Sequence, residues 1–131
     1  MNRTFTPDEA NSALAQVRPL AERMVALRAR LAELEGEQRE VTRVVAGNGS
    51  GDAVGDAQTP EFAQLARELR EVAGELALIG VHVKDPDTGL VDFPSRRGDE
   101  EVLLCWRVGE PSVEWWHTPE EGFQGRRRID W

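Results

Sequence analysis

Few of the residues that usually carry covalent or metal chemistry are present: the chain of 131 residues has one cysteine, two histidines and one lysine. A single cysteine cannot form a disulfide within the chain, which agrees with a reducing cytoplasm. The opening residues, MNRTFTPDEAN, lack the apolar core of a signal peptide. No apolar run approaches the roughly 18 residues that a membrane span needs. We therefore expect a cytoplasmic protein without a membrane segment.

A surplus of basic residues is also missing. The net charge is -8, and residues 1–46 hold seven basic against seven acidic residues. The balance is two against six over residues 47–80 and seven against eleven over residues 81–131. Because a nucleic-acid backbone selects for a basic surface, we expect no nucleic-acid partner for this acidic chain. The run Arg126–Arg128 is a local exception.

The first half of the chain has the pattern of a long helix. Thr6, Pro7 and Glu9 form a capping box, which predicts a helix start at this point. Apolar residues then recur at alternating spacings of three and four, as in the heptad seam of a coiled coil. They are Ala10, Ala13, Val17, Leu20, Met24, Leu27, Leu31, Leu34, Val41 and Val45. Pro19 removes one backbone hydrogen bond and predicts a kink or break near Arg18.

A second helix follows a glycine-rich stretch. The composition of GNGSGDAVGDAQ predicts a flexible loop over residues 47–59. Thr59 and Pro60 start the next helix, and Gly80 ends it. Its apolar positions repeat the three-four spacing: Phe62, Leu65, Leu69, Val72, Leu76 and Ile79. Residues 1–80 therefore predict an antiparallel helical hairpin, whose seam is filled either within one chain or between chains.

Beyond Gly80 the apolar period changes to two, which predicts an antiparallel β-sheet of about four strands over residues 81–131. The turn at 85–89 sets the register of a first hairpin. It pairs Lys84 with Leu90, Val83 with Val91, His82 with Asp92 and Val81 with Phe93. With the helices packed on this sheet, residues 1–131 form a single α+β domain.

A second hairpin is predicted around the turn at 109–112. Its register pairs Val108 with Val113, Arg107 with Glu114, Trp106 with Trp115 and Leu104 with His117. Trp106, Trp115 and His117 would then face the helices. Cys105 and Trp116 would lie on the opposite face of the sheet.

Four segments resemble a known family. They read FTPDEANSALAQVRPL, GLVDFPS, EEVLLCWRVGE and WWHTPEEGFQGR, and together they extend over most of the chain. This pattern is similar to a bacterial uncharacterised family, domain of unknown function family 2203. The resemblance implies a small prokaryotic protein without an established activity, so it assigns no catalytic residue.

The first candidate site combines His82, Asp92 and Cys105. The predicted register places His82 beside Asp92, and Cys105 could share their face. Such a set could serve nucleophilic catalysis or bind zinc. The competing interpretation is a buried, apolar cysteine next to a cross-strand His82–Asp92 ion pair.

The second candidate site is His117, whose nearby carboxylates could complete a divalent metal site. These carboxylates belong to Glu110, Glu120 and Glu121, whereas Glu114 points to the other face in the predicted register. A hydrogen bond from His117 to the following turn or to a helix is the alternative. A third candidate is a partner surface formed by Trp116 beside Arg107, where an exposed aromatic residue would bind a protein or ligand.

No catalytic signature is evident, which favours a non-enzymatic protein. The leading hypothesis is an interaction or scaffold protein that self-associates through its heptad helices, with other protein partners as an option. The alternative is a small metal-binding protein or metal-dependent hydrolase that uses His117 or the His82–Asp92 pair. A divalent metal is the only cofactor that either hypothesis invokes.

Overall fold

The computed structural model describes residues 3–47 and 59–131. For residues 38–47 it describes the backbone but not the side chains. Most of the predicted loop at 47–59 lies outside the described residues, as do the side chains of Val41 and Val45. The helices are α1 (Pro7–Gly47) and α2 (Pro60–Ile79). The strands are β1 (His82–Asp85), β2 (Leu90–Arg97), β3 (Glu100–Arg107), β4 (Trp115–His117) and β5 (Arg127–Arg128). A short 3-10 helix, η2 (Phe123–Gly125), lies between β4 and β5.

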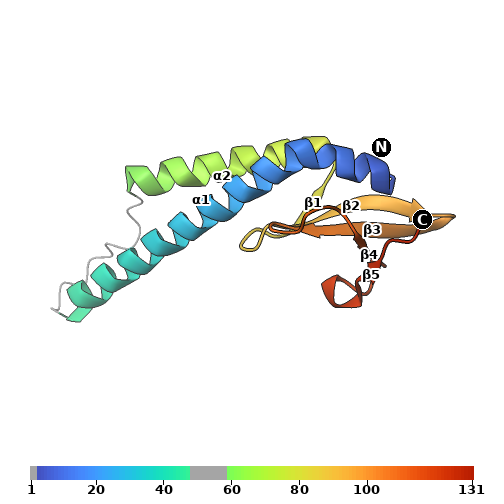
Figure 1. Ribbon diagram of the computed structural model, residues 1–131. Coiled ribbons are helices and arrows are strands. Elements are labelled where there is room, and N and C mark those ends of the chain that lie inside the picture. The colour runs from blue at the N-terminus through green and yellow to red at the C-terminus, as the bar shows by residue number, and fades with distance from the viewer. Residues whose placement is uncertain (1–2, 48–58) are drawn as a thin grey trace.

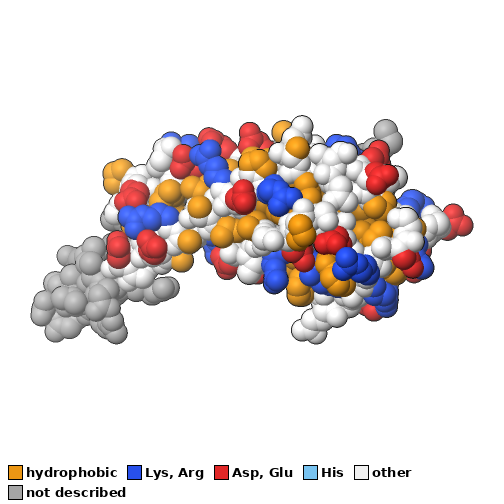
Figure 2. All heavy atoms as spheres, viewed as in Figure 1, with side chains coloured by type: hydrophobic (Ala, Val, Ile, Leu, Met, Phe, Trp, Pro, Cys, Tyr) orange, Lys and Arg blue, Asp and Glu red, His pale blue; other side chains and the backbone are white. Residues whose placement is uncertain are grey.

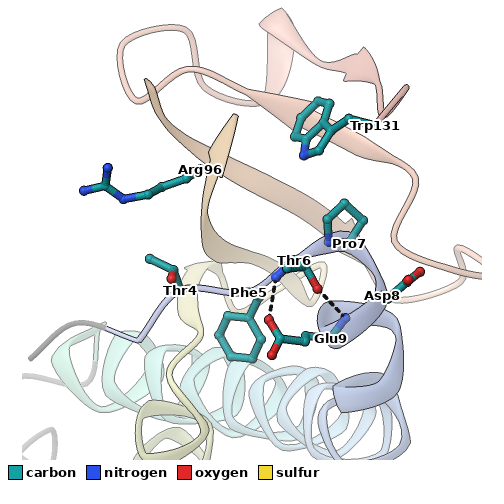
Figure 3. Close-up of a pocket in the computed structure, with 8 residues that line it drawn as sticks. All are labelled: Thr4, Phe5, Thr6, Pro7, Asp8, Glu9, Arg96 and Trp131. Atoms are coloured by element: carbon teal, nitrogen blue, oxygen red, sulfur yellow. Dashed lines mark hydrogen bonds between the residues drawn. The ribbon is translucent and has the colours of Figure 1, made fainter. Parts of the chain in front are cut away.

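Both helices begin where their capping residues predict. The Thr6 amide donates to Glu9 Oε1 at 2.9 Å, and the Glu9 amide donates to Thr6 Oγ1 at 3.1 Å (Figure 3). At α2, the Phe62 amide donates to Thr59 Oγ1 at 3.1 Å. Gly80 ends α2 with a φ of 108°, a conformation that a residue with a side chain adopts at a cost. The predicted antiparallel helical hairpin is therefore present (Figure 1).

The long helix does not break at Pro19. α1 continues through this residue to Gly47, although its axis bends within the first half (Figure 1). Pro19 is exposed, whereas Val17 and Ala21 on either side of it are fully buried. We attribute the continuity to this packing, because it holds both flanking turns in place.

The buried stripe of α1 is close to the predicted seam. Its members are Ala10, Leu14, Val17, Ala21, Met24, Leu27, Leu31 and Leu34. Leu14 and Ala21 are more deeply buried than Ala13 and Leu20, which are only partly covered. The stripe is wide because α1 packs against α2 on one side and against the sheet on the other.

The sheet has five antiparallel strands in the order β1-β2-β3-β4-β5 (Figure 1). The sequence predicted about four. The segment before α1 is hydrogen-bonded to β2 of this sheet. The Phe5 amide donates to the Pro94 carbonyl at 2.7 Å, and Ser95 Oγ donates to the Phe5 carbonyl at 2.6 Å. The face toward the helices carries the core side chains of the strands. They are Val91, Phe93, Val102, Leu104, Trp106 and Trp116.

Two of the four pairs predicted for the first hairpin are present, and Val81, which precedes β1, does not pair with Phe93 in the ladder. His82 pairs with Asp92 and Val83 with Val91, as predicted, but Asp85 rather than Lys84 pairs with Leu90. The ladder shifts between Val83 and Asp85, so Lys84 is the extra residue of a β-bulge.

The second predicted hairpin register is wrong by one residue. Leu104 pairs with Trp116 and Cys105 with Trp115. Residues 108–114 connect β3 to β4, and α1 binds this connection. Asn11 accepts from the Val113 amide at 2.7 Å and donates to the Val113 carbonyl at 3.1 Å.

A one-residue shift reverses the direction of every side chain in the strand. Trp116 therefore faces the core and is 5% exposed, while His117 moves to the opposite face of the sheet. Trp116 is therefore not the exposed aromatic residue that the predicted partner surface with Arg107 needs. Arg107 is exposed and lies over the ring of Phe123, at 5.3 Å.

Candidate metal centre

Three neighbouring strands bring one ionisable side chain each to the face opposite the helices. Asp92 belongs to β2, Cys105 pairs with it from β3, and His117 comes from β4. Asp92 and Cys105 are each 1% exposed and His117 is 3% exposed. Their potential ligand atoms all lie within 4.8 Å of one another. The sheet thus has a small, deeply buried polar cluster on its second face.

A turn after β4 helps to enclose this cluster. Glu121 Oε1 accepts from Thr118 Oγ1 at 3.0 Å and from the Thr118 amide at 3.4 Å. These hydrogen bonds, from the hydroxyl first, lower the pKa of Glu121. Pro119, Gly122 and Phe123 follow and line a cavity above the cluster.

The hydrogen bonds of His117 place its protons. Nδ1 lies 2.8 Å from the Thr118 carbonyl oxygen, which can only accept, so Nδ1 carries a hydrogen. Nε2 lies 3.1 Å and 3.2 Å from the two carboxylate oxygens of Asp92. An unprotonated Nε2 and a carboxylate would repel each other at this distance. A positive centre is therefore required between them, either a proton or a metal ion.

Cys105 does not have the environment of a nucleophilic cysteine. Burial, followed by the negative charge of Asp92, raises the pKa of its thiol to about 12. Reactive cysteines have lowered pKa values and a histidine free to take the proton. Both ring nitrogens of His117 are already occupied. This environment disfavours nucleophilic catalysis by Cys105 with His117, while a cation would stabilise a thiolate here.

A cavity of about 160 Å³ adjoins all three side chains. Its lining is otherwise mainly apolar, with one lysine. The remaining residues are Lys84, Leu90, Leu103, Pro119, Gly122 and Phe123. A small molecule or water bound in this cavity would contact the ligand atoms directly.

Two predicted members of the site lie elsewhere. His82 pairs with Asp92 through the backbone, but its side chain is exposed, and the described structure contains no hydrogen bond between the two side chains. Asp92 binds His117 instead. Glu110 accepts from Arg126 Nη2 at 2.8 Å and from the Arg107 amide at 2.7 Å, so it is not a partner of His117.

The sequence named Asp92, Cys105 and His117 but assigned them to two separate sets. The register of β4 was the cause, since the adjacent Trp115 and Trp116 fit either face equally well by hydrophobicity. Lys84 was missed entirely as a cavity residue. Its one available signal was compositional, because it is the only lysine among 16 basic residues.

A larger hollow of about 360 Å³ lies at the start of α1, between Pro7, Arg96 and Trp131 (Figure 3). The side chains of Thr6 and Glu9 already occupy the capping positions there. It therefore lacks the converging polar groups that distinguish the Asp92–Cys105–His117 cluster.

The fold and this cluster define a small α+β protein with a buried Asp–Cys–His set on the outer face of its sheet. The chain belongs to the family of the uncharacterized conserved protein DUF2203, whose model matches residues 3–129. This confirms the resemblance seen in the sequence. No match was found among curated proteins or among solved structures. Within the part of the chain that the structure describes, neither helix is long and apolar enough to cross a bilayer.

Proposed function

We propose that this is a metal-binding protein, in which Asp92, Cys105 and His117 hold one divalent transition-metal ion. The observation that carries the proposal is the approach of three different ligand types, from three strands, to within 4.8 Å of one another. In a tetrahedral zinc site, ligand atoms lie roughly 3.3–3.8 Å apart, given zinc–ligand bonds of about 2.0–2.3 Å. Small side-chain movements are enough to reach that geometry.

The ligand types favour zinc. Thiolate, imidazole and carboxylate are the three side-chain groups that zinc sites use, and a thiolate disfavours magnesium and calcium. The second nitrogen of His117 supports this assignment. Metal-bound histidines usually donate their other N–H to a carbonyl or carboxylate, and Nδ1 lies 2.8 Å from the Thr118 carbonyl oxygen.

The metal content of protein purified without a metal-affinity column tests the proposal. We expect about one equivalent of zinc by elemental analysis, and loss of most of it in Cys105→Ser and His117→Gln. His82→Gln is the matched control, because it changes the other histidine of the chain and should keep the metal. Zinc at about 100 times its dissociation constant should stabilise the apo protein by roughly 2.7 kcal/mol.

Two results together would contradict this function: wild-type protein without metal, and a melting temperature that zinc, cobalt and manganese leave unchanged. Melting data alone would not suffice, because a ligand that also binds the unfolded thiol stabilises less. Elemental analysis and melting should therefore be compared on the same preparation.

Self-association through the helices is a second proposal, supported by two features of the hairpin. α1 has 41 residues and α2 has 20, so α1 extends past its partner (Figure 1). Leu78 of α2 is 88% exposed, the largest exposed fraction among the large apolar residues of the described chain. Such a scaffold role and a metal site are compatible within one protein.

A further inference from the structure

We infer that the metal site is open on one side and binds a small monoanion, such as a carboxylate, with Lys84 as the positively charged partner of that anion. This inference rests on the proposed metal function. It adds the class of ligand that the site takes. If the metal proves to be inaccessible to solutes, this inference fails while the metal function stands.

The first step is the number of protein ligands. Among the residues that the structure describes, the cluster contains Asp92, Cys105 and His117 and no fourth histidine, cysteine or carboxylate. Tetrahedral zinc has four ligands, and structural sites usually supply all four from the protein. A site with three protein ligands leaves one position for water or another molecule. The cavity of about 160 Å³ adjoins the same three side chains and offers that position.

The second step is the placement of Lys84. It is the extra residue of the bulge in β1, between the pairs Val83–Val91 and Asp85–Leu90. Bulges re-aim side chains and are frequent beside functional sites. Lys84 is an exposed residue that lines the cavity together with the three ligands. In the described part of the chain, no carboxylate lies within ion-pair distance of it.

The third step is charge. A divalent ion bound by a thiolate, a carboxylate and a neutral imidazole forms a centre with no net charge. Lys84 then gives the cavity one positive charge, which matches a monoanion and leaves a dianion uncompensated. The walls formed by Leu90, Leu103 and Phe123 are apolar and would accept a short alkyl group. One oxygen of a carboxylate can bind the metal while the other faces the ammonium group.

Cobalt-loaded protein provides the test, because its visible spectrum reports both the thiolate and changes at the fourth position. Sodium acetate is the probe, titrated at constant ionic strength with sodium perchlorate. We expect a saturable change in the cobalt bands. Lys84→Gln should weaken acetate binding about twofold to fivefold, as expected for the loss of one exposed ion pair. Lys84→Arg should restore part of the affinity, and Arg96→Gln, which changes an exposed arginine outside the cavity, should leave it unaltered.

Lys84→Gln should also keep the full cobalt content and the same spectrum without acetate, which separates an effect on the anion from an effect on the metal. A cobalt spectrum that acetate does not change would overturn the inference and leave the metal function standing. Equal acetate affinity in wild-type protein and Lys84→Gln would overturn the role of Lys84. Failure to bind cobalt at all would instead remove the metal function on which the inference rests.

Discussion

At the residue scale, the cluster depends on one cysteine, Cys105, whose surroundings disfavour the negatively charged thiolate form. Cys105 was expected to be buried, and it is 1% exposed. The sequence also suggested that Cys105 could share the face of Asp92, and the two residues are paired across β2 and β3. His117 could not be added from sequence alone. Its direction depends on a register that long-range contacts with α1 select.

The raised thiol pKa predicts an alkaline loss of stability in the metal-free protein. The pKa of Cys105 rises from 9.0 to about 12 on folding, mainly through burial. Below pH 9 the thiol is protonated in both states, so it has no effect on the free energy of unfolding. Between pH 9 and pH 12 only the unfolded state ionises, and stability falls by up to about 1.4 kcal/mol per pH unit.

Chemical denaturation with a chelator present, at pH 8 and pH 10, measures this effect. Wild-type protein should lose more stability over that interval than Cys105→Ala, which has no thiol to ionise. Parallel losses in the two proteins would show that other groups cause the alkaline decline. Bound zinc should suppress the effect, because a coordinated sulfur is already a thiolate.

At the element scale, the largest difference between prediction and structure is the position of β4. Period-two patterning located the strand, and the turn at 109–112 indicated the hairpin that precedes it. Neither signal shows whether Trp115 or Trp116 faces the helices. The choice is made by α1, which binds the connection before β4 through residues that are about a hundred positions away in sequence. Local patterns contain no information about such contacts, whereas they predicted both helices and the β1–β2 pairs well.

Although Asn11 is an exposed helix residue, we therefore expect it to contribute substantially to the stability of the fold. Asn11→Ala removes its hydrogen bonds to the amide and carbonyl of Val113 and leaves both groups short of a partner. The free energy of unfolding should fall by about 1–3 kcal/mol. Ser12→Ala, at the adjacent exposed position of α1, is the control and should change stability by less than about 0.5 kcal/mol. Similar values for the two variants would contradict a role of Asn11 in holding this connection.

Zinc affinity gives a second measurement on the same variants. β4 carries His117, and Asn11 fixes the segment directly before β4. If this contact selects the register, Asn11→Ala should weaken zinc binding as well as stability. Unchanged affinity would mean that pairing within the sheet is sufficient to direct His117 toward Asp92.

At the scale of the whole molecule, the two faces of the sheet have different roles. One face packs on the helical hairpin and forms the apolar core, while the other holds the polar cluster under the C-terminal segment (Figure 1). On the outer surface, acidic and basic side chains are interspersed over the helices (Figure 2). Most seam residues of α1 from Ala10 to Leu34 are buried within one chain, and Ala13 and Leu20 are partly covered. Association through the helices would therefore use mainly other positions.

Leu78 provides the direct test of self-association. Light scattering at high micromolar concentration should give about twice the monomer mass of 14.6 kDa if the helices join two chains. Leu78→Glu should then restore the monomer, since burying an unpaired carboxylate in an interface is costly. Glu75→Gln changes a neighbouring exposed residue of α2 and should leave the dimer intact. A wild-type monomer would exclude this mode of association.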